Sequence, residues 1–108
     1  MGLLGNMFGK EEKNEAVQTP SEGTYVVEDT FKLNIPQDLV VVGKIRGCIK
    51  EGDMVYVEGA DENDLILVKE LNIFRDRVKS AKDTPVALYL VNGIEYGISK
   101  GTVLHVKV

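Results

Sequence analysis

Four basic side chains gathered in a short stretch form the pattern in this sequence that could most readily bind a charged ligand. They are Arg75, Arg77, Lys79 and Lys82. Guanidinium and ammonium groups at this spacing can contact RNA phosphates or an acidic protein surface. Acidic residues within the same stretch reduce its positive charge, and charged connections between strands usually lie in solvent. The stretch is therefore a candidate RNA- or partner-binding loop, with a plain solvated loop as the simpler alternative.

Residues that could hold a metal or act as nucleophiles are few. Cys48 and His105 are the only residues of their types, so an internal disulfide is impossible and a zinc site with sulfur and nitrogen ligands is disfavoured. The acidic stretch from residue 58 to residue 64 lacks the ligand spacing of a calcium-binding loop. No nucleophile–base pair or catalytic carboxylate pair can be identified. The sequence predicts no enzyme, no bound metal and no cofactor.

Aromatic side chains could provide flat surfaces on which bases stack. Tyr56 and Tyr89 fall on the outward phase of their predicted strands, and so does His105. Aromatic residues are also common in strands for packing alone. A structural role is therefore the simpler interpretation of all four tyrosines, Tyr25, Tyr56, Tyr89 and Tyr96.

The length and charge of the chain restrict the classes of protein to which it can belong. Its 108 residues suffice for one domain. Its 13 basic and 17 acidic residues give a net charge of −4, which disfavours non-specific binding to nucleic acid. No apolar run approaches the ~20 residues of a membrane span, and the first residues fit neither a secretory signal nor a myristoylation site. We expect a cytoplasmic protein.

Residues 1–22 differ in composition from the rest of the chain. An apolar start interrupted by glycines is followed by a charged and polar stretch. Such a segment cannot bury enough surface to offset its ordering entropy, so residues 1–22 are predicted to form a disordered tail. The alternative is one helical turn that contacts a partner or a membrane surface, although short isolated helices are marginal. That turn would consist of Leu3, Leu4, Met7 and Phe8.

From residue 23 onward, short β-rich runs are separated by turn residues, which is typical of a sandwich or barrel. The alternation slips within the fourth run, which predicts a bulge at Lys69-Glu70. Residues 75–84 are predicted to be a charged connection. Closing the strands into a ring removes exposed edges, so an antiparallel β-barrel over residues 23–108 is the predicted fold. The six predicted strands cover residues 25–33, 39–45, 54–57, 65–74, 86–91 and 102–108.

The inward phase of these strands predicts the hydrophobic core. Val108, at the end of the last run, shares that phase. Gly47 and Gly52 are predicted to reverse the chain between the second and third strands. The predicted core consists of Val41, Ile45, Ile49, Val55, Val57, Val68, Leu71, Ile73, Val86, Leu88, Leu90, Leu104 and Val106.

Residues 47–59 read GCIKEGDMVYVEG and resemble the G-x-I-K-x-G-D-x-V-x-V-x-G segment of domain II of elongation factor Tu and other translational GTPases. The resemblance covers about residues 25–106 and implies the β-barrel of that family. The phosphate loop of the family's GTPase, G-x-x-x-x-G-K-[ST], does not occur in the sequence, so we expect neither GTP binding nor GTP hydrolysis. Four further segments agree in order, namely VEDTF at residues 27–31, LNIFR at 71–75, VALYLVNGI at 86–94 and ISKGTVL at 98–104.

In the family that this chain resembles, domain II helps to hold the aminoacylated end of tRNA. Val42 stands here in place of a threonine, Asn72 in place of an acid and Val91 in place of an arginine, while the glycine-arginine-glycine-threonine turn is replaced by residues 34–38. Of that set, only Arg75 matches the family. A pocket whose polar groups are exchanged loses most of its discrimination, so capture of aminoacyl-tRNA is not expected.

The sequence as a whole predicts a non-enzymatic binding or adaptor module, with a protein or the ribosome as partner. The alternative is an RNA- or ribosome-contacting domain that uses the basic loop over residues 75–82. Salt-dependent binding to RNA would distinguish the second interpretation from the first.

Overall fold

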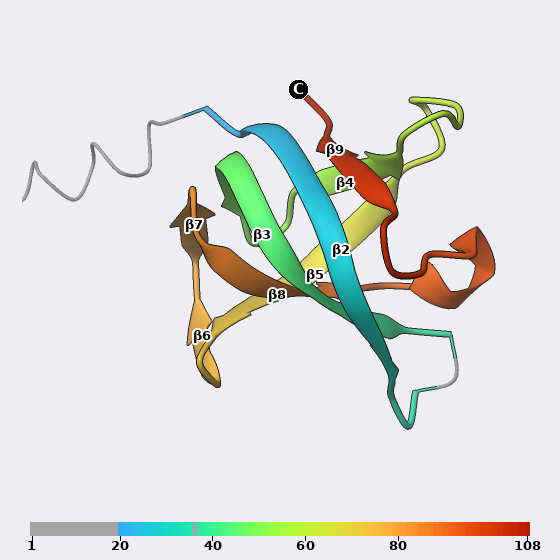
Figure 1. Cartoon of the computed structure of the whole chain (residues 1–108), viewed down its shortest axis with the longest axis horizontal. Helices are drawn as coiled ribbons and strands as arrows, with labels where there is room; N and C mark the ends of the chain where they lie inside the picture. The colour runs from blue at the N-terminus through green and yellow to red at the C-terminus, as the bar shows by residue number, and fades with distance from the viewer. Residues whose placement is uncertain (1–19, 36) are drawn as a thin grey trace, which may run out of the picture.

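The computed structural model describes residues 20–35 and 37–108, which form a single β-barrel (Figure 1). Residues 1–19, which include the predicted apolar turn, lie outside the described residues, and the first strand begins at Glu22. Helical structure in the described part is limited to one short 3₁₀ turn, η1 (Gly93–Tyr96). No helix of these residues is long and apolar enough to cross a membrane. The predicted all-β class is confirmed.

All six predicted strands are present, and β3 continues as far as Lys50. The predicted connection over residues 75–84 is wrong in part, because it contains two short strands. Its first half forms a hairpin with the preceding strand, and its second half pairs with the end of β3. The strands are β2 (Glu22–Lys32), β3 (Leu39–Lys50), β4 (Met54–Val57), β5 (Ile66–Ile73), β6 (Asp76–Val78), β7 (Ser80–Lys82), β8 (Pro85–Leu90) and β9 (Val103–Val106).

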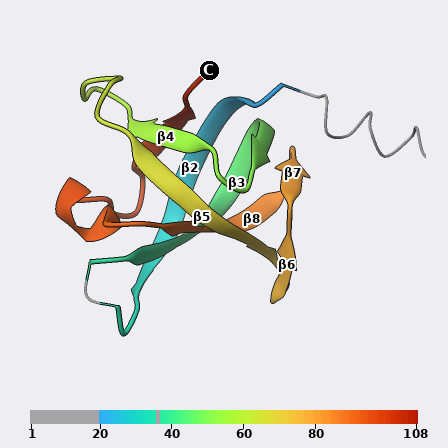
Figure 2. The same ribbon diagram turned by 180° about the vertical axis from the view of Figure 1, so that it is seen from behind.

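Six of these strands close into a ring. The hydrogen-bonded order is β2-β9-β4-β5-β8-β3, and β3 pairs again with β2, so every strand of the ring has two neighbours. All pairings are antiparallel. Figure 2 views the same ring from behind, with β5 in front and the short strand β6 at its end. The predicted closed antiparallel barrel is confirmed.

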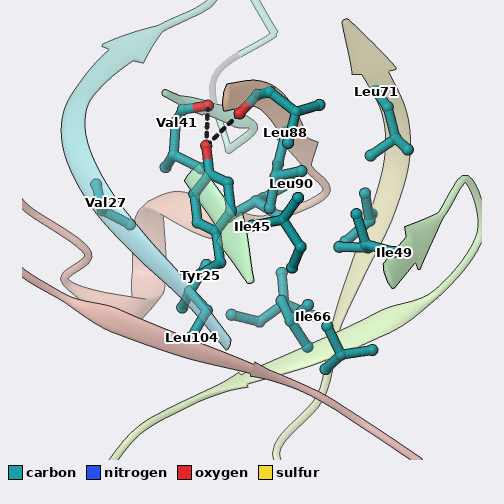
Figure 3. Packing of buried hydrophobic residues seen from close by; sticks show 14 of the residues in the cluster. Tyr25, Val27, Val41, Ile45, Ile49, Ile66, Leu71, Leu88, Leu90 and Leu104 are labelled. Carbon is teal, nitrogen blue, oxygen red and sulfur yellow. Dashed lines mark hydrogen bonds between the residues drawn. The ribbon is translucent and has the colours of Figure 1, made fainter. Parts of the chain in front are cut away.

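The ring closes through β2, and Tyr25 lies at that junction. Tyr25 is opposite Ile45 of β3 on one side and opposite Leu104 of β9 on the other. Its side chain is fully buried, and Figure 3 shows it crossing the barrel interior toward Val41. The hydroxyl lies within hydrogen-bond distance of the carbonyl oxygens of Val41, at 3.3 Å, and of Val86. The phenol therefore joins β2 to β3 and β8 through the core.

The ring of Tyr25 has room because Gly43 lacks a side chain. A Cβ built at Gly43 would lie 2.1 Å from the carbonyl oxygen of Val26 and 3.1 Å from the Tyr25 ring. Burial is the main cause that raises the pKa of Tyr25 above its usual value, and Glu28 adds to the effect. The phenol is therefore neutral in the folded barrel and able to donate.

The predicted core is largely confirmed. Val57 and Ile73 are only partly buried, because they lie near the ends of β4 and β5. The inward placement of Val108 is wrong, because β9 ends at Val106 and Val108 is 91% exposed. Further buried apolar residues outside the predicted set are Tyr25, Val27, Leu39, Cys48, Ile66, Ala81 and Ile98.

Two irregularities interrupt the strand registers. The shift between Val68 and Glu70, where β5 pairs with β8, confirms the predicted bulge. A second shift, between Val27 and Asp29 of β2, was not predicted. Each shift moves the following side chains to the other phase relative to the partner strand.

Gly47 does not reverse the chain, contrary to the prediction, because it lies inside β3. Its φ of 112° is positive, yet its pairing with Gly23 of β2 stays in register. Its N–H donates to the Asp83 carboxylate at 2.8 Å, and the Asp83 N–H donates back to the Gly47 carbonyl at 3.0 Å. The reversal occurs instead in the turn at Gly52, which has a φ of 94°. Gly47 thus serves to dock the turn that follows β7 on β3.

Truncation of Leu88 tests the core assignment. Leu88 is fully buried between β3 and β5, so Leu88→Ala should lower the free energy of unfolding by about 2–5 kcal/mol in urea denaturation. Val26→Ala is the control, because Val26 is 44% exposed. A change of less than 1 kcal/mol at Leu88, about that of a surface substitution, would contradict the assignment.

Candidate functional site

A shallow pocket of about 310 Å³ lies on the outer face of β3, β8 and β5. Its lining is mostly apolar and includes one acidic, one basic and one amide side chain. Ten residues line it, namely Glu28, Val42, Gly43, Asn72, Ile73, Phe74, Arg75, Pro85, Val86 and Ala87. We call this site the β3–β8–β5 pocket.

Strand register brings residues far apart in sequence into this pocket. Val42 of β3 is opposite Ala87 of β8, which is opposite Asn72 of β5. Because side chains alternate along a strand, these three point outward where their neighbours point into the core. The bulge in β2 between Val27 and Asp29 places Glu28 at the rim of the same pocket. The alternation of inward and outward side chains along β3, β5 and β8 therefore determines which side chains line the pocket.

The turn between β5 and β6 forms one wall of the pocket. Ile73 is opposite Asp76, so only Phe74 and Arg75 connect the two strands. Both have positive φ, 51° for Phe74 and 75° for Arg75. Hairpin turns of this kind favour Asn-Gly or Asp-Gly, because bulky residues are strained at positive φ. Phe74 is also 91% exposed, so its ring contributes little burial that would offset the strain.

The polar groups of the pocket differ in how far they are satisfied. The Asn72 amide donates to the Glu70 carboxylate at 3.0 Å. Among the described residues, neither Glu28 nor Arg75 forms an ion pair with another residue of the chain. The pocket can therefore receive an apolar group on its floor while its rim offers one free carboxylate and one free guanidinium.

The four predicted basic residues do not act as one cluster. Arg77 Nε lies 2.7 Å from a Glu51 carboxylate oxygen and 4.0 Å from Glu70. Lys79 Nζ also lies 4.0 Å from Glu51. The hydrogen bond from Arg77 lowers the pKa of Glu51 and raises the pKa of Arg77. Arg75 alone lines the pocket.

Lys82 lies apart from the pocket, at the end of β7 and opposite Cys48. Cys48 itself is a buried free thiol. The role of the four basic residues in binding stays a prediction, with Arg75 as the member nearest to a concave site.

The tyrosines occupy four different environments. Tyr25 belongs to the core, and Tyr96 donates toward Asp64 at 3.2 Å. Lys69 Nζ lies 5.2 Å from the centroid of the Tyr89 ring, a cation–π contact. Three of the rings thus have partners within the chain that account for their positions.

Tyr56 stacks on His105, the residue opposite it on β9. The ring centroids are 5.3 Å apart and the planes differ by 21°. The His105 Nε2 atom also lies 3.1 Å from a Glu58 carboxylate oxygen. The signal that could have found this pair is the cross-strand register, since Tyr56 and His105 are directly opposite.

A metal site is not evident in the part of the chain that the structure describes. No group of three or more histidine, cysteine, aspartate or glutamate side chains is arranged there to hold an ion.

Comparison with solved structures identifies the fold. Elongation factor SelB from Methanococcus maripaludis, in its apo form, superposes with a TM-score of 0.67 and 23% identity over 88% of this chain. GDP-bound aIF5B from Aeropyrum pernix superposes with a TM-score of 0.69 and 16% identity over 92% of this chain. The fold is that of a translation-factor barrel. No protein-family model and no curated protein sequence matches the chain.

The translation-factor barrel is only a part of those two proteins. This chain corresponds to 23% of the SelB chain and to 18% of the aIF5B chain. The likeness confirms the architecture implied by the sequence resemblance. At these identities it carries no information on ligands.

Several positions in the sequence were compared with the tRNA-contacting residues of the translational GTPases. Three of these positions line the pocket, namely Val42, Asn72 and Arg75. Val91 does not line it. Sequence reasoning missed Glu28, Phe74, Pro85 and Ala87, and only Phe74 gave a usable signal. That signal is an aromatic residue at a position where a hairpin turn requires Asn, Asp or Gly.

Replacing Phe74 by asparagine tests whether the turn is strained. Asparagine tolerates positive φ, so Phe74→Asn should raise the free energy of unfolding by about 1 kcal/mol. Urea denaturation at a protein concentration at which the chain is monomeric measures this change, and Asp76→Asn, just outside the turn, is the control. Destabilisation by Phe74→Asn would show that the ring stabilises the barrel.

The Glu51–Arg77 pair predicts a pH-dependent contribution to stability. The pKa of Glu51 is lowered in the folded state from its usual 4.5, chiefly by the Arg77 hydrogen bond. The stabilisation is therefore complete above pH 4.5 and is lost as the pH falls through the lower, folded-state value. Glu51→Gln should be less stable than the wild-type chain near neutral pH, and the difference should shrink below pH 4.5.

Thermal unfolding between pH 7 and pH 3 measures that difference, with Glu62→Gln as the control, because Glu62 is exposed. A gap between wild type and Glu51→Gln that stays constant down to pH 3 would contradict the linkage.

Proposed function

We propose that this chain is a non-enzymatic binding module whose β3–β8–β5 pocket receives an apolar side chain of a protein partner. The observation that carries the proposal is Phe74, held at positive φ and 91% exposed beside an apolar pocket. A strained residue that does not help the fold points to a role in binding. Exposed aromatic residues next to pockets are typical anchors of protein interfaces.

The chemistry of the pocket favours protein over nucleic acid. Its lining includes Val42, Pro85 and Ala87, which offer no hydrogen bonds from their side chains to a base or a ribose. The Glu28 carboxylate on the rim would repel a phosphate. Arg77 and Lys79, which could attract phosphates, lie near Glu51 instead. The net charge of −4 acts in the same direction.

The absence of a phosphate-loop motif supports the non-enzymatic part of the proposal. The exchanged polar residues, Val42 and Asn72, likewise argue against capture of aminoacyl-tRNA.

Titration of the ¹⁵N-labelled chain with two small probes tests the ligand class. N-acetyl-leucine methylamide supplies an apolar side chain, and the trinucleotide CCA supplies bases and phosphates. The leucine probe should shift the amide signals of Val42, Asn72, Ile73 and Ala87, which surround the pocket. The variant Ala87→Glu should abolish these shifts, because it places a carboxylate on the apolar floor. Thr24→Glu, on β2 and outside the pocket lining, should not.

The same titration evaluates RNA contact by the loop over residues 75–82. Shifts of these amides with CCA alone, fading as salt is added, would favour the RNA interpretation and contradict the proposal. The absence of any response of the pocket to the leucine probe, at a protein concentration at which the chain is monomeric, would also contradict it.

A further inference from the structure

The pocket face carries a protruding group and a depression on one surface. The Phe74 ring projects from the β5–β6 turn with 91% of its area exposed, and the pocket lies directly beside it. A surface that carries both a projection and a matching depression can be complementary to itself. Two copies related by a two-fold axis use the same patch on each side, so that each contact occurs twice.

The charges on this face show the same self-complementarity. Glu28 and Arg75 both line the pocket, and within the described residues neither is neutralised by an ion pair. Under a two-fold axis, Arg75 of one copy can meet Glu28 of the other, and the reverse. This two-fold arrangement would give both Glu28 and Arg75 of each copy a partner of opposite charge.

The apolar surface continues beyond the pocket. In the next outward row, Phe31 of β2 is opposite Val40 of β3, which is opposite Tyr89 of β8. Phe31 is 52% exposed. A stable interface buries about 800 Å² on each partner, more than a shallow pocket alone supplies, and this row extends the apolar area available.

We propose that this face is the contact between two copies of the chain, with Phe74 of each copy seated in the pocket of the other. The inference rests on the proposed function and names a second copy as the protein partner. Phe74 supplies the apolar group that the pocket receives, and the Arg75–Glu28 pairs determine the orientation of the two copies.

Sedimentation velocity over a series of concentrations tests the proposal on the full chain. The wild-type chain should shift with concentration toward twice the mass of one chain. Phe74→Asn should weaken this association by about tenfold or more, because it removes the central aromatic anchor. Since asparagine suits positive φ, this variant should remain folded, which circular dichroism checks. Val108→Asn is the matched control, because Val108 is equally exposed but follows β9.

Exchange of the two charges gives a second, independent test. Arg75→Glu and Glu28→Arg should each weaken association, because each places like charges together. The double variant Glu28→Arg/Arg75→Glu should restore it, since the pair is rebuilt with reversed polarity. A double variant no stronger than the single variants would overturn the proposed orientation.

Failure of this inference is distinguishable from failure of the proposed function. A wild-type chain that stays monomeric at every concentration, or a dimer unaffected by Phe74→Asn, overturns the inference. If the leucine probe still shifts the pocket amides in that case, the pocket binds a different protein and the proposed function stands.

Discussion

Strand β2 pairs with β3 along one edge and with β9 along the other, and the barrel exists as a closed ring only because both pairings are made. Three residues of β2, Thr24 to Val26, take part in both pairings, and Tyr25 is the middle one. Its phenol crosses the interior to the carbonyl oxygens of Val41 and Val86 (Figure 3), and its ring occupies the space above Gly43. Closure therefore depends on a buried polar side chain with its acceptors in place, rather than on apolar packing alone.

The pocket follows from that closure. Once Val41, Leu71 and Leu88 are fixed inside the ring, their strand neighbours Val42, Asn72 and Ala87 must face outward together. The core of the barrel is thus stabilised by one set of positions, and the adjacent set forms the outer surface of the same strands. In the β5–β6 turn, Phe74 and Arg75 adopt positive φ, a conformation that hairpin turns usually reserve for asparagine and glycine.

Alternation and turn residues were enough to predict the strands of the ring, most of the core and the bulge near Lys69. Strands β6 and β7 were not predicted. Three-residue strands with charged side chains form only against partner strands already in place, here β5 and the end of β3. The hydrogen bonds of the buried Tyr25 hydroxyl were not predicted either, because its acceptors lie 16 and 61 residues away in sequence. The pocket could be predicted only at positions that a family resemblance singles out, since Glu28 and Pro85 reach it through a bulge and a register that a single strand does not reveal.

Native-state amide hydrogen exchange of the wild-type chain and of Tyr25→Phe tests the dependence on ring closure most directly. If closure at β2 holds the barrel together, the amides that join β2 to β3 and β9 exchange as slowly as those joining β3 to β8, by global unfolding. Loss of the phenol then accelerates all of them equally. If β2 instead exchanges by local opening while β3, β8 and β5 keep their protection, closure at β2 does not hold the barrel together.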